Sequence, residues 1–318
     1  MVLMQMERRE EKTEWLRKAL ERYPGEVRLN EPIAPYTSMK VGGPADAMVF
    51  PKSVSDVIDL MELLDQHHLP YFILGGGSNL LVKDGGMAGV VIHLKHLNQI
   101  EMTGAAEVQG GTRDVTAQAG VSYPKLSLFA AEKRLTGLEF AVGIPGTVGG
   151  AVAMNAGIPG EETAAVLKEI TLVDDAGRVQ RIPKGQIKFG YRSAVFPKGV
   201  VLSAAFSLFP APAEQIDEKM RGLLQRRRET QPLSFPNVGS VFKNPKGEFA
   251  GRLVEEAGLK GHRAGGAQIS EKHGNFIVNR GAATAKEVLA LIELIRQKVE
   301  ATRGIVLELE VKVVGKDK

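Results

Sequence analysis

Residues 71–79 constrain the fold most, because a strand-like run of apolar residues ends directly in three glycines. Residues 71–74 are typical of a short buried strand. Glycine has no Cβ, so the backbone after this strand can turn sharply and approach a ligand closely. Successive backbone N–H groups favour an anion such as phosphate. A tight turn between two strands explains the stretch equally well. The residues that would form an anion site are Gly75, Gly76, Gly77, Ser78 and Asn79.

A second bare stretch covers residues 143–157, where five glycines stand among small residues. Two such loops suit a long diphosphate ligand better than a single phosphate. Neither loop matches the G-x-G-x-x-G dinucleotide fingerprint or the G-x-x-x-x-G-K-[ST] nucleotide loop, which argues against a Rossmann dehydrogenase and an ATPase. The candidate ligand residues in this stretch are Gly143, Gly146, Thr147, Gly149, Gly150 and Ala151.

The length of 318 residues allows two or three domains. Hydrophobic residues make up 43% and charged residues 25%, which is the usual range for soluble proteins. Pro210-Ala211-Pro212 is typical of a domain boundary. We therefore expect domains at 1–97, 98–209 and 210–318. The first would hold the N-terminal helix.

Composition excludes several kinds of site. The chain has no cysteine, which rules out disulfides, thiolate catalysis and cysteine-ligated zinc. The only spaced histidine pair, His93 and His96, lacks the helix and glutamate of a zinc protease, so we expect no metal site. A net charge of +4 fits small anionic ligands as well as nucleic acid. Without an 18-residue apolar run or an apolar N-terminal signal core, we expect a cytoplasmic protein.

Hydrophobic periodicity predicts a mixture of helices and strands. Ser53 resembles the cap of a helix that runs to about residue 67 and precedes the strand at 71–74. Other helices are expected at 7–23, 122–135, 213–229, 249–257 and 284–301. Strands at 167–174, 179–182 and 200–208 should form an antiparallel meander, and further strands are expected at 275–279 and 305–314.

Three polar residues could support chemistry. Arg192 presents a planar fork that matches a carboxylate, although a surface arginine is the simpler interpretation. Ser240 follows a glycine, but no G-x-S-x-G elbow surrounds it, so a turn residue is more plausible than a hydrolase nucleophile. Glu310 shares the polar face of the last predicted strand with Glu308 and Lys312, which is also typical of a solvated edge.

Taken together, these motifs resemble the UDP-N-acetylenolpyruvoylglucosamine reductase family. The resemblance covers about residues 30–315. The two glycine loops alone would indicate only the wider flavin-binding class that includes vanillyl-alcohol oxidase. The segments that carry the family resemblance, in the family's order, are 37–43, 74–79, 143–157, 190–193, 239–245 and 309–312.

The resemblance implies an α+β fold, with a two-lobed FAD-binding domain of the vanillyl-alcohol-oxidase type and a C-terminal α+β substrate domain. It also implies non-covalent FAD, NADPH as co-substrate, and reduction of UDP-N-acetylglucosamine enolpyruvate to UDP-N-acetylmuramate for peptidoglycan. In the family, NADPH reduces the flavin and leaves. The flavin hydride then adds to the vinyl carbon of the sugar nucleotide.

The resemblance assigns roles to individual residues. Arg192 matches the arginine that binds the substrate carboxylate, and Glu310 matches a glutamate held protonated or hydrogen-bonded beside it. Ser240 matches the proton donor to the enolate that hydride addition creates. Lys243 could steady the serine oxygen. The expected substrate-binding residues are Tyr191, Lys243, Asn244, Arg228 and Gln268.

The chain departs from the family pattern in two places. Lys312 stands where the family often has arginine, which keeps the charge but loses the fork. No insertion carrying a tyrosine lies between Arg192 and Pro210, so the chain resembles the shorter subtype. Any arginine of 226–228 could hold the substrate diphosphate. We expect a monomer.

Two other function classes stay open at this point. One is another FAD-dependent oxidase or dehydrogenase of the same flavin-binding class, which would not need the Arg192, Ser240 and Glu310 trio. The other is a non-catalytic anion- or nucleic-acid-binding protein. The basic stretch 219–228 lacks interleaved aromatic residues, which weakens the nucleic-acid hypothesis.

Overall fold

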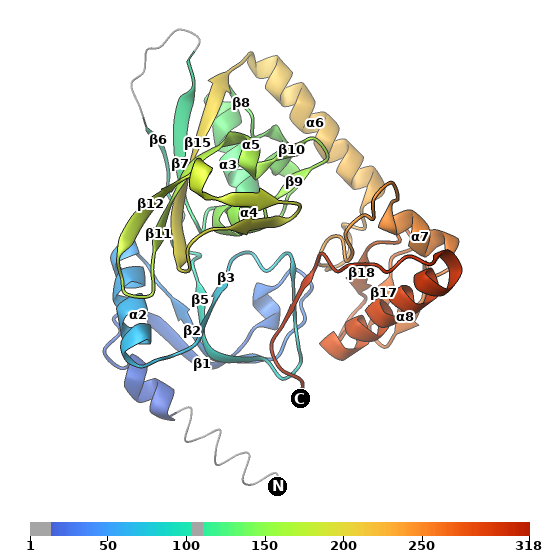
Figure 1. Cartoon of the computed structure of the whole chain (residues 1–318), viewed down its shortest axis with the longest axis horizontal. Helices are drawn as coiled ribbons and strands as arrows, with labels where there is room; N and C mark the ends of the chain where they lie inside the picture. The colour runs from blue at the N-terminus through green and yellow to red at the C-terminus, as the bar shows by residue number, and fades with distance from the viewer. Residues whose placement is uncertain (1–13, 104–110) are drawn as a thin grey trace. The chain divides into compact units, whose positions relative to one another are not determined.

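The computed structural model describes residues 14–103 and 111–318. The chain divides into two compact units, and each unit combines three separate segments (Figure 1). The first unit comprises Met1–Leu29, Ala47–Gly76 and Gly89–Gln225, and the second comprises Asn30–Asp46, Gly77–Ala88 and Arg226–Lys318. The expected domain limits at residues 97 and 209 stay a prediction.

The largest sheet of the first unit is antiparallel and contains the three strands that were predicted as a meander. The meander order is wrong, because Leu167–Val173 lies between Val179–Pro183 and Val200–Pro210 and pairs with both, and local patterning predicts strands but not their neighbours. Its strand order is β12 (Val179–Pro183), β11 (Leu167–Val173), β15 (Val200–Pro210), β7 (Arg113–Gln118) and β6 (Ile100–Thr103), and β8 (Leu135–Thr136) pairs with the end of β15. Along β15, buried residues alternate with more exposed ones, as expected when one face of a sheet packs on a core.

A second sheet has the order β1 (Glu26–Pro32), β2 (Pro44–Phe50), β5 (Met87–His93) and β3 (Tyr71–Leu74). Strand β3 pairs with β5 in parallel and ends where the first glycine loop begins. Helix α2 (Val54–Gln66) lies between β2 and β3 in the chain. The side chain of Ser53 accepts the Asp56 N–H, which confirms the predicted cap.

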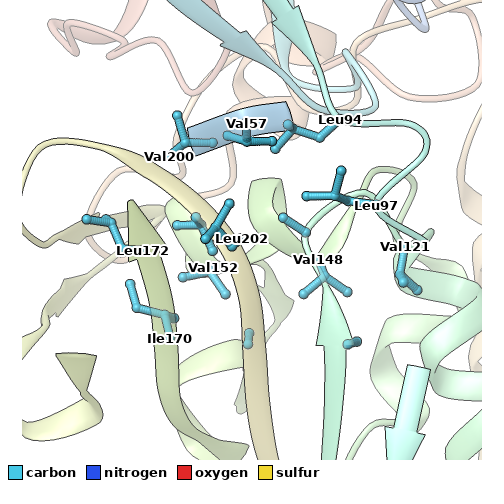
Figure 2. Close-up of a cluster of buried hydrophobic side chains, with 14 of the residues drawn as sticks. Val57, Leu94, Leu97, Val121, Val148, Val152, Ile170, Leu172, Val200 and Leu202 are labelled. Atoms are coloured by element: carbon cyan, nitrogen blue, oxygen red, sulfur yellow. The ribbon is translucent and has the colours of Figure 1, made fainter. Parts of the chain in front are cut away.

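One hydrophobic core joins these elements of the first unit. Figure 2 shows part of it, with Val57 of α2, Val148 and Val152 of α4, and residues of β11 and β15 drawn together. The predicted first helix is seen at 14–20, and its expected start lies outside the described residues. The remaining elements are α3 (Tyr123–Glu132), η2 (Glu139–Gly143), α4 (Val148–Ala153), β9 (Gly157–Ile158), β10 (Glu161–Glu162), α5 (Thr163–Val166), η3 (Lys184–Gln186), β13 (Lys188–Gly190) and β14 (Ser193–Val195). Helix α6 (Ala213–Thr230) begins in this unit, and its residues from Arg226 onward belong to the second.

The second unit has its own core, to which helix α8 contributes Val288, Leu291, Ile295 and other buried residues. A three-stranded antiparallel sheet has the order β16, β17, β18, and β19 pairs with β4 in parallel. The elements of this unit are η1 (Ala34–Tyr36), β4 (Leu80–Val82), α7 (Ala250–Glu256), β16 (Arg263–Ala264), β17 (Ala267–Ile269), β18 (Ile277–Asn279), α8 (Ala285–Arg303) and β19 (Lys312–Val314).

The predicted strand over 305–314 is wrong in extent. Only Lys312–Val314 forms a strand, preceded by an isolated bridge between Leu309 and Phe242. The predicted alternation is present: Leu307 and Val311 are buried, while Glu308 and Lys312 are exposed. Alternation of apolar and polar residues shows which side of an extended segment is buried. A strand also needs a neighbouring segment that pairs with it through regular hydrogen bonds. Here the partner segment is irregular.

None of the helices within 14–103 and 111–318 combines the length and apolar character needed to cross a lipid bilayer.

Helix α8 begins with a complete capping box, which generates a stability prediction. The Thr284 side chain accepts the Glu287 N–H, and the Glu287 carboxylate accepts the Thr284 N–H. We expect Thr284→Ala to lower the free energy of unfolding by about 1 kcal/mol, because the Glu287 N–H loses the hydroxyl that accepts it. Urea unfolding monitored by circular dichroism measures this. Thr302→Ala, at an exposed position near the other end of α8, is the matched control and should change stability less. Equal losses would contradict the capping argument.

Candidate active site

The two glycine loops meet in the first unit. A Cβ on Gly75 would lie 2.6 Å from the Thr147 Oγ1, and a Cβ on Gly76 would lie 2.6 Å from the Gly146 Cα. Side chains at either glycine would therefore collide with the second loop. Thr147 also begins helix α4, where its hydroxyl accepts the Gly150 N–H at 3.5 Å. The structure thus brings together four predicted cofactor residues and leaves bare backbone on both loops.

Other predicted cofactor residues of the second loop lie in the same unit. The Gly149 N–H donates to the Ala119 carbonyl at 2.9 Å, and a Cβ at Gly149 would touch Ala119 at 3.0 Å. Ala151 is buried. Gly143 ends the short helix η2 just before the loop. The small residues therefore allow the loop to pack closely on its own unit as well as to expose backbone.

The end of the first loop belongs to the second unit. Gly77 has φ of +59°, and a Cβ there would lie 2.4 Å from the Tyr36 carbonyl oxygen, so only glycine fits. Its carbonyl accepts the Ser38 N–H at 3.1 Å. The Asn79 side chain donates to the Glu310 carbonyl at 3.1 Å, and the Asn79 carbonyl accepts the Lys312 N–H at 3.0 Å. Predicted cofactor and catalytic residues are therefore directly bonded in this unit.

Arg192 lies at the tip of the hairpin formed by β13 and β14, where Tyr191 and Arg192 make a two-residue turn. Its φ is +52°, a left-handed conformation that costs a non-glycine residue free energy. The guanidinium lies 5.1 Å from the centre of the exposed Tyr191 ring. Buried Asn155, from the second glycine loop, donates to the Gly190 carbonyl at 3.2 Å and accepts the Ala164 N–H at 2.9 Å. The hairpin tip is thus fixed to the glycine loop.

Ser240 lies in an irregular segment of the second unit, between a glycine turn and a buried pair of residues. Gly239 has φ of +78°, and its N–H donates to the Asn237 side chain at 2.9 Å. Val241 and Phe242, directly after Ser240, are buried. Ser240 itself is half-buried. Both sides of the serine are therefore anchored while its own side chain is not enclosed in the core.

Glu310 lies on a segment paired with the one that follows Ser240. The N–H groups of Glu310 and Val311 both donate to the Val241 carbonyl, at 2.9 Å and 3.3 Å. Two residues facing one partner make a β-bulge, a device that turns a side chain away from its regular direction and is common beside active sites. The structure therefore brings Ser240 and Glu310 onto neighbouring segments, whereas Arg192 belongs to the first unit.

The predicted substrate-binding residues have varied surroundings. Lys243 forms an ion pair with Glu308 at 3.1 Å, and the Asn244 side chain accepts the Ala250 N–H at the start of α7. Gln268 is buried and donates to the Gly261 carbonyl at 3.0 Å. Arg228 is exposed near the end of α6, where its backbone carbonyl accepts a hydrogen bond from the Lys272 ammonium. Their roles toward a substrate stay predictions.

Two buried asparagines were missed by sequence reasoning as supports of the site. Asn155 stood inside the second glycine stretch, where the glycines drew attention, and Asn275 stood in a predicted strand. Both are buried, and both use the side-chain amide on backbone groups. A polar residue within an apolar stretch is the only signal that the sequence offered, and it does not reveal the partner.

Among the described residues, no group of three or more histidine and carboxylate side chains is placed to hold a metal ion. His93 ends β5 opposite Leu74, next to the first glycine loop. Burial, with the nearby Lys95 charge, lowers the pKa of His93 to about 4, so its imidazole is neutral around pH 7.

Comparison with known proteins agrees with this arrangement. Residues 45–183 match a family model described as an FAD binding domain, and residues 231–314 match the C-terminal domain of UDP-N-acetylenolpyruvoylglucosamine reductase. The chain is 41% identical to the reductase of that name from Geobacillus thermodenitrificans, covering 91% of this chain and 93% of the relative. It is 46% identical to UDP-N-acetylenolpyruvoylglucosamine reductase 2 of Symbiobacterium thermophilum, over 92% and 94%.

A solved structure is also similar. The UDP-N-acetylenolpyruvylglucosamine reductase of Thermus caldophilus aligns with a TM-score of 0.74 at 37% identity, covering 91% of this chain and 98% of that one. The expected α+β fold, with an FAD-binding domain and a C-terminal domain, is confirmed. The bare glycine loops, the bulge that joins Glu310 to the segment directly after Ser240 and the similarity along most of the chain lead to one conclusion: the chain belongs to the UDP-N-acetylenolpyruvoylglucosamine reductase family.

Proposed function

We propose that this protein reduces UDP-N-acetylglucosamine enolpyruvate to UDP-N-acetylmuramate with NADPH, as a step in making peptidoglycan precursors. It is an FAD-dependent oxidoreductase of the reductase family, so the alternative of an unrelated oxidase in the wider flavin class is set aside. The observation that carries the proposal is the bulge pairing of the Ser240 and Glu310 segments within a member of this family.

The residues of the first unit fit FAD. Gly75 and Gly76 pack against Gly146 and Thr147 so closely that side chains are excluded, which leaves backbone N–H groups for a diphosphate. When bound, FAD supplies a hydride acceptor for NADPH and a hydride donor to the vinyl carbon. We assign the diphosphate of the cofactor to these two loops. We propose that attachment is non-covalent, since the chain has no cysteine and no motif for attachment through a histidine.

Arg192 is proposed to bind the substrate carboxylate. Hydride addition to the terminal vinyl carbon places negative charge on the adjacent carbon, delocalised into the carboxylate as an enolate. A fixed guanidinium stabilises that charge and lowers the barrier. The left-handed backbone of Arg192 supports this role, because strain at a half-buried arginine is retained where the direction of the side chain matters.

Ser240 is proposed to donate the proton, and Glu310 to hydrogen-bond beside the carboxylate oxygens. A serine hydroxyl is a weak acid, but the enolate carbon is a strong base, so a well-aimed hydroxyl suffices. The pairing of the two segments through the Val241 carbonyl supports a fixed relation between these side chains. The Lys243 ammonium already pairs with the Glu308 carboxylate. We therefore propose that Lys243 contributes positive charge near the site and does not hydrogen-bond to Ser240.

Several finer points complete the proposal. Tyr191, Asn244, Gln268 and Arg228 remain candidates for contact with the sugar nucleotide. The chain is proposed to be a monomer of the shorter subtype that works in the cytoplasm. The absence of a tyrosine-bearing insertion between Arg192 and Pro210 supports the subtype assignment.

The reaction itself is tested with purified protein. We expect a yellow protein that releases free FAD on denaturation and that oxidises NADPH rapidly only when UDP-N-acetylglucosamine enolpyruvate is present. The product should carry one hydrogen from NADPH on the former vinyl carbon and one from solvent on its neighbour. NADPH consumption that is indifferent to the sugar nucleotide would contradict the proposal, as would flavin that stays with the precipitated chain.

The strain at Arg192 predicts a trade between stability and activity. Arg192→Gly should hold or raise the free energy of unfolding, by about 1 kcal/mol at most, because glycine adopts positive φ at little steric cost. The same variant should reoxidise reduced flavin slowly with the enolpyruvyl substrate. Arg134→Gly is the matched control, since Arg134 also has positive φ, +56°, after helix α3. It should gain similar stability with full activity. Loss of stability in Arg192→Gly alone would show that the arginine holds the hairpin.

Ser240→Ala should separate the two half-reactions. Flavin reduction by NADPH should be nearly normal, because the serine is not needed for hydride transfer from NADPH. Reoxidation by the enolpyruvyl substrate should slow by ~10²-fold or more, the usual scale for a positioned acid. Stopped-flow absorbance of the flavin measures both rates. Ser234→Ala, an exposed serine of the same irregular segment, should behave as wild type. Rapid reoxidation in Ser240→Ala would assign the proton to another group.

A further inference from the structure

The side chain of Asn275 clamps the backbone directly after Ser240. Its Oδ1 accepts the Phe242 N–H at 2.9 Å, and its Nδ2 donates to the Phe242 carbonyl at 2.8 Å. The Asn275 carbonyl also accepts the Val241 N–H at 2.9 Å. Asn275 is 4% exposed, and Val241 and Phe242 are buried. One asparagine therefore makes three hydrogen bonds to two consecutive residues.

The chemistry of this clamp is specific to a side-chain amide. A carboxamide donates and accepts in the same plane, so it can replace the strand partner that Phe242 lacks on this side. A buried N–H or carbonyl without a partner is costly, and Phe242 would have both. Without the clamp, the segment would have to shift to satisfy them. Any such shift would move Ser240, which is two residues from Phe242.

The same segment also holds Glu310. The Val241 carbonyl accepts the N–H groups of Glu310 and Val311 in the β-bulge, and the Lys243 N–H donates to the Glu308 carbonyl at 2.9 Å. The clamp thus fixes Val241, whose carbonyl sets the pairing register of the segment that carries Glu310. Movement of Val241 would change the positions of Ser240 and Glu310 together.

Asn275 is itself held in place. Its N–H donates to the His273 Nδ1 at 3.2 Å, and the His273 N–H donates to the Ser270 Oγ at 3.3 Å. The His273 ring packs edge-on against Phe276, and burial lowers the pKa of His273 below its usual value. A neutral ring keeps Nδ1 available as an acceptor, which suits a support that must not reorganise.

We infer that Asn275 is a positioning residue for the reductase reaction, acting by fixing the backbone that aims the Ser240 hydroxyl and sets the register of Glu310. The inference rests on the proposed role of Ser240 as proton donor. Asn275 touches no reacting atom; it acts through the Val241–Phe242 backbone.

The test compares Asn275→Ala with Asn279→Ala. Asn279 is also a buried asparagine, four residues further on, and its side chain braces the Met39 carbonyl and the N–H groups of Gly281 and Ala283. Both variants lose buried hydrogen bonds, so both should lower the melting temperature. Only Asn275→Ala should slow flavin reoxidation by the enolpyruvyl substrate, by roughly 10²-fold, the scale of a catalytic group displaced by about an ångström. Flavin reduction by NADPH should change less than about two-fold.

The solvent deuterium isotope effect on reoxidation separates positioning from simple destabilisation. A misplaced hydroxyl makes proton delivery limit the rate, so the isotope effect should rise in Asn275→Ala and stay at the wild-type value in Asn279→Ala. Equal isotope effects in both variants and the wild type, with a matching loss of melting temperature, would overturn the inference. If Asn275→Ala does not retain FAD, Asn275→Ser, which keeps one hydroxyl near Phe242, is measured below its melting temperature against the same criterion.

The Ser240→Ala variant distinguishes failure of the positioning role of Asn275 from failure of Ser240 as proton donor. Slow reoxidation in Ser240→Ala together with wild-type behaviour in Asn275→Ala would refute only the positioning role. Rapid reoxidation in Ser240→Ala would refute the proton donor on which the inference depends. Slow reoxidation in both variants, with a raised isotope effect in Asn275→Ala, is the result expected.

Discussion

Buried backbone groups must find hydrogen-bond partners, and in this protein the segments that carry the proposed chemistry lie where helices and sheets do not supply them. Asparagine side chains meet the requirement. Asn155 holds the hairpin tip in the first unit through the Gly190 carbonyl. In the second unit, Asn79 bonds the Glu310 carbonyl and Asn275 brackets Phe242. Irregular backbone is thus made rigid without being made regular, which leaves functional side chains free to point at a ligand.

Unusual backbone geometry occurs at or beside several of the proposed functional residues in each unit. Arg192, Gly77 and Gly239 all have positive φ, and Glu310 begins a bulge. The positive φ costs stability at Arg192, which is not a glycine, and such strain persists where surrounding contacts determine it. The contacts here are the packed glycine loops in one unit and the clamped Val241–Phe242 pair in the other. Unusual backbone geometry is therefore accompanied by contacts that hold it, as expected where the direction of a side chain matters more than local stability.

Much of the fold could be predicted because it depends on short-range patterns. The Ser53 cap of α2, the existence of strands β11, β12 and β15, and the amphipathic helix α8 each follow from spacing and local chemistry, whereas the order of those three strands in the sheet does not. The final strand was predicted too long, because alternation at 305–311 records burial on one side but says nothing of a regular partner. The interleaving of three chain segments in each unit was also beyond such patterns, since it depends on contacts between residues far apart in the sequence.

The sequence by itself determined which residue types are available: two bare glycine loops, an arginine in the segment 190–193, a serine in a glycine–proline stretch and a glutamate on a polar face. Together with their order, these were enough to indicate the family. Only the tertiary structure decided how they are held. The Val241 carbonyl accepts the Glu310 N–H, and the Asn275 side-chain amide bonds the N–H and the carbonyl of Phe242, both through long-range hydrogen bonds. Such bonds leave no periodic signal, because their partners are set by the packing of the whole unit rather than by neighbouring residues.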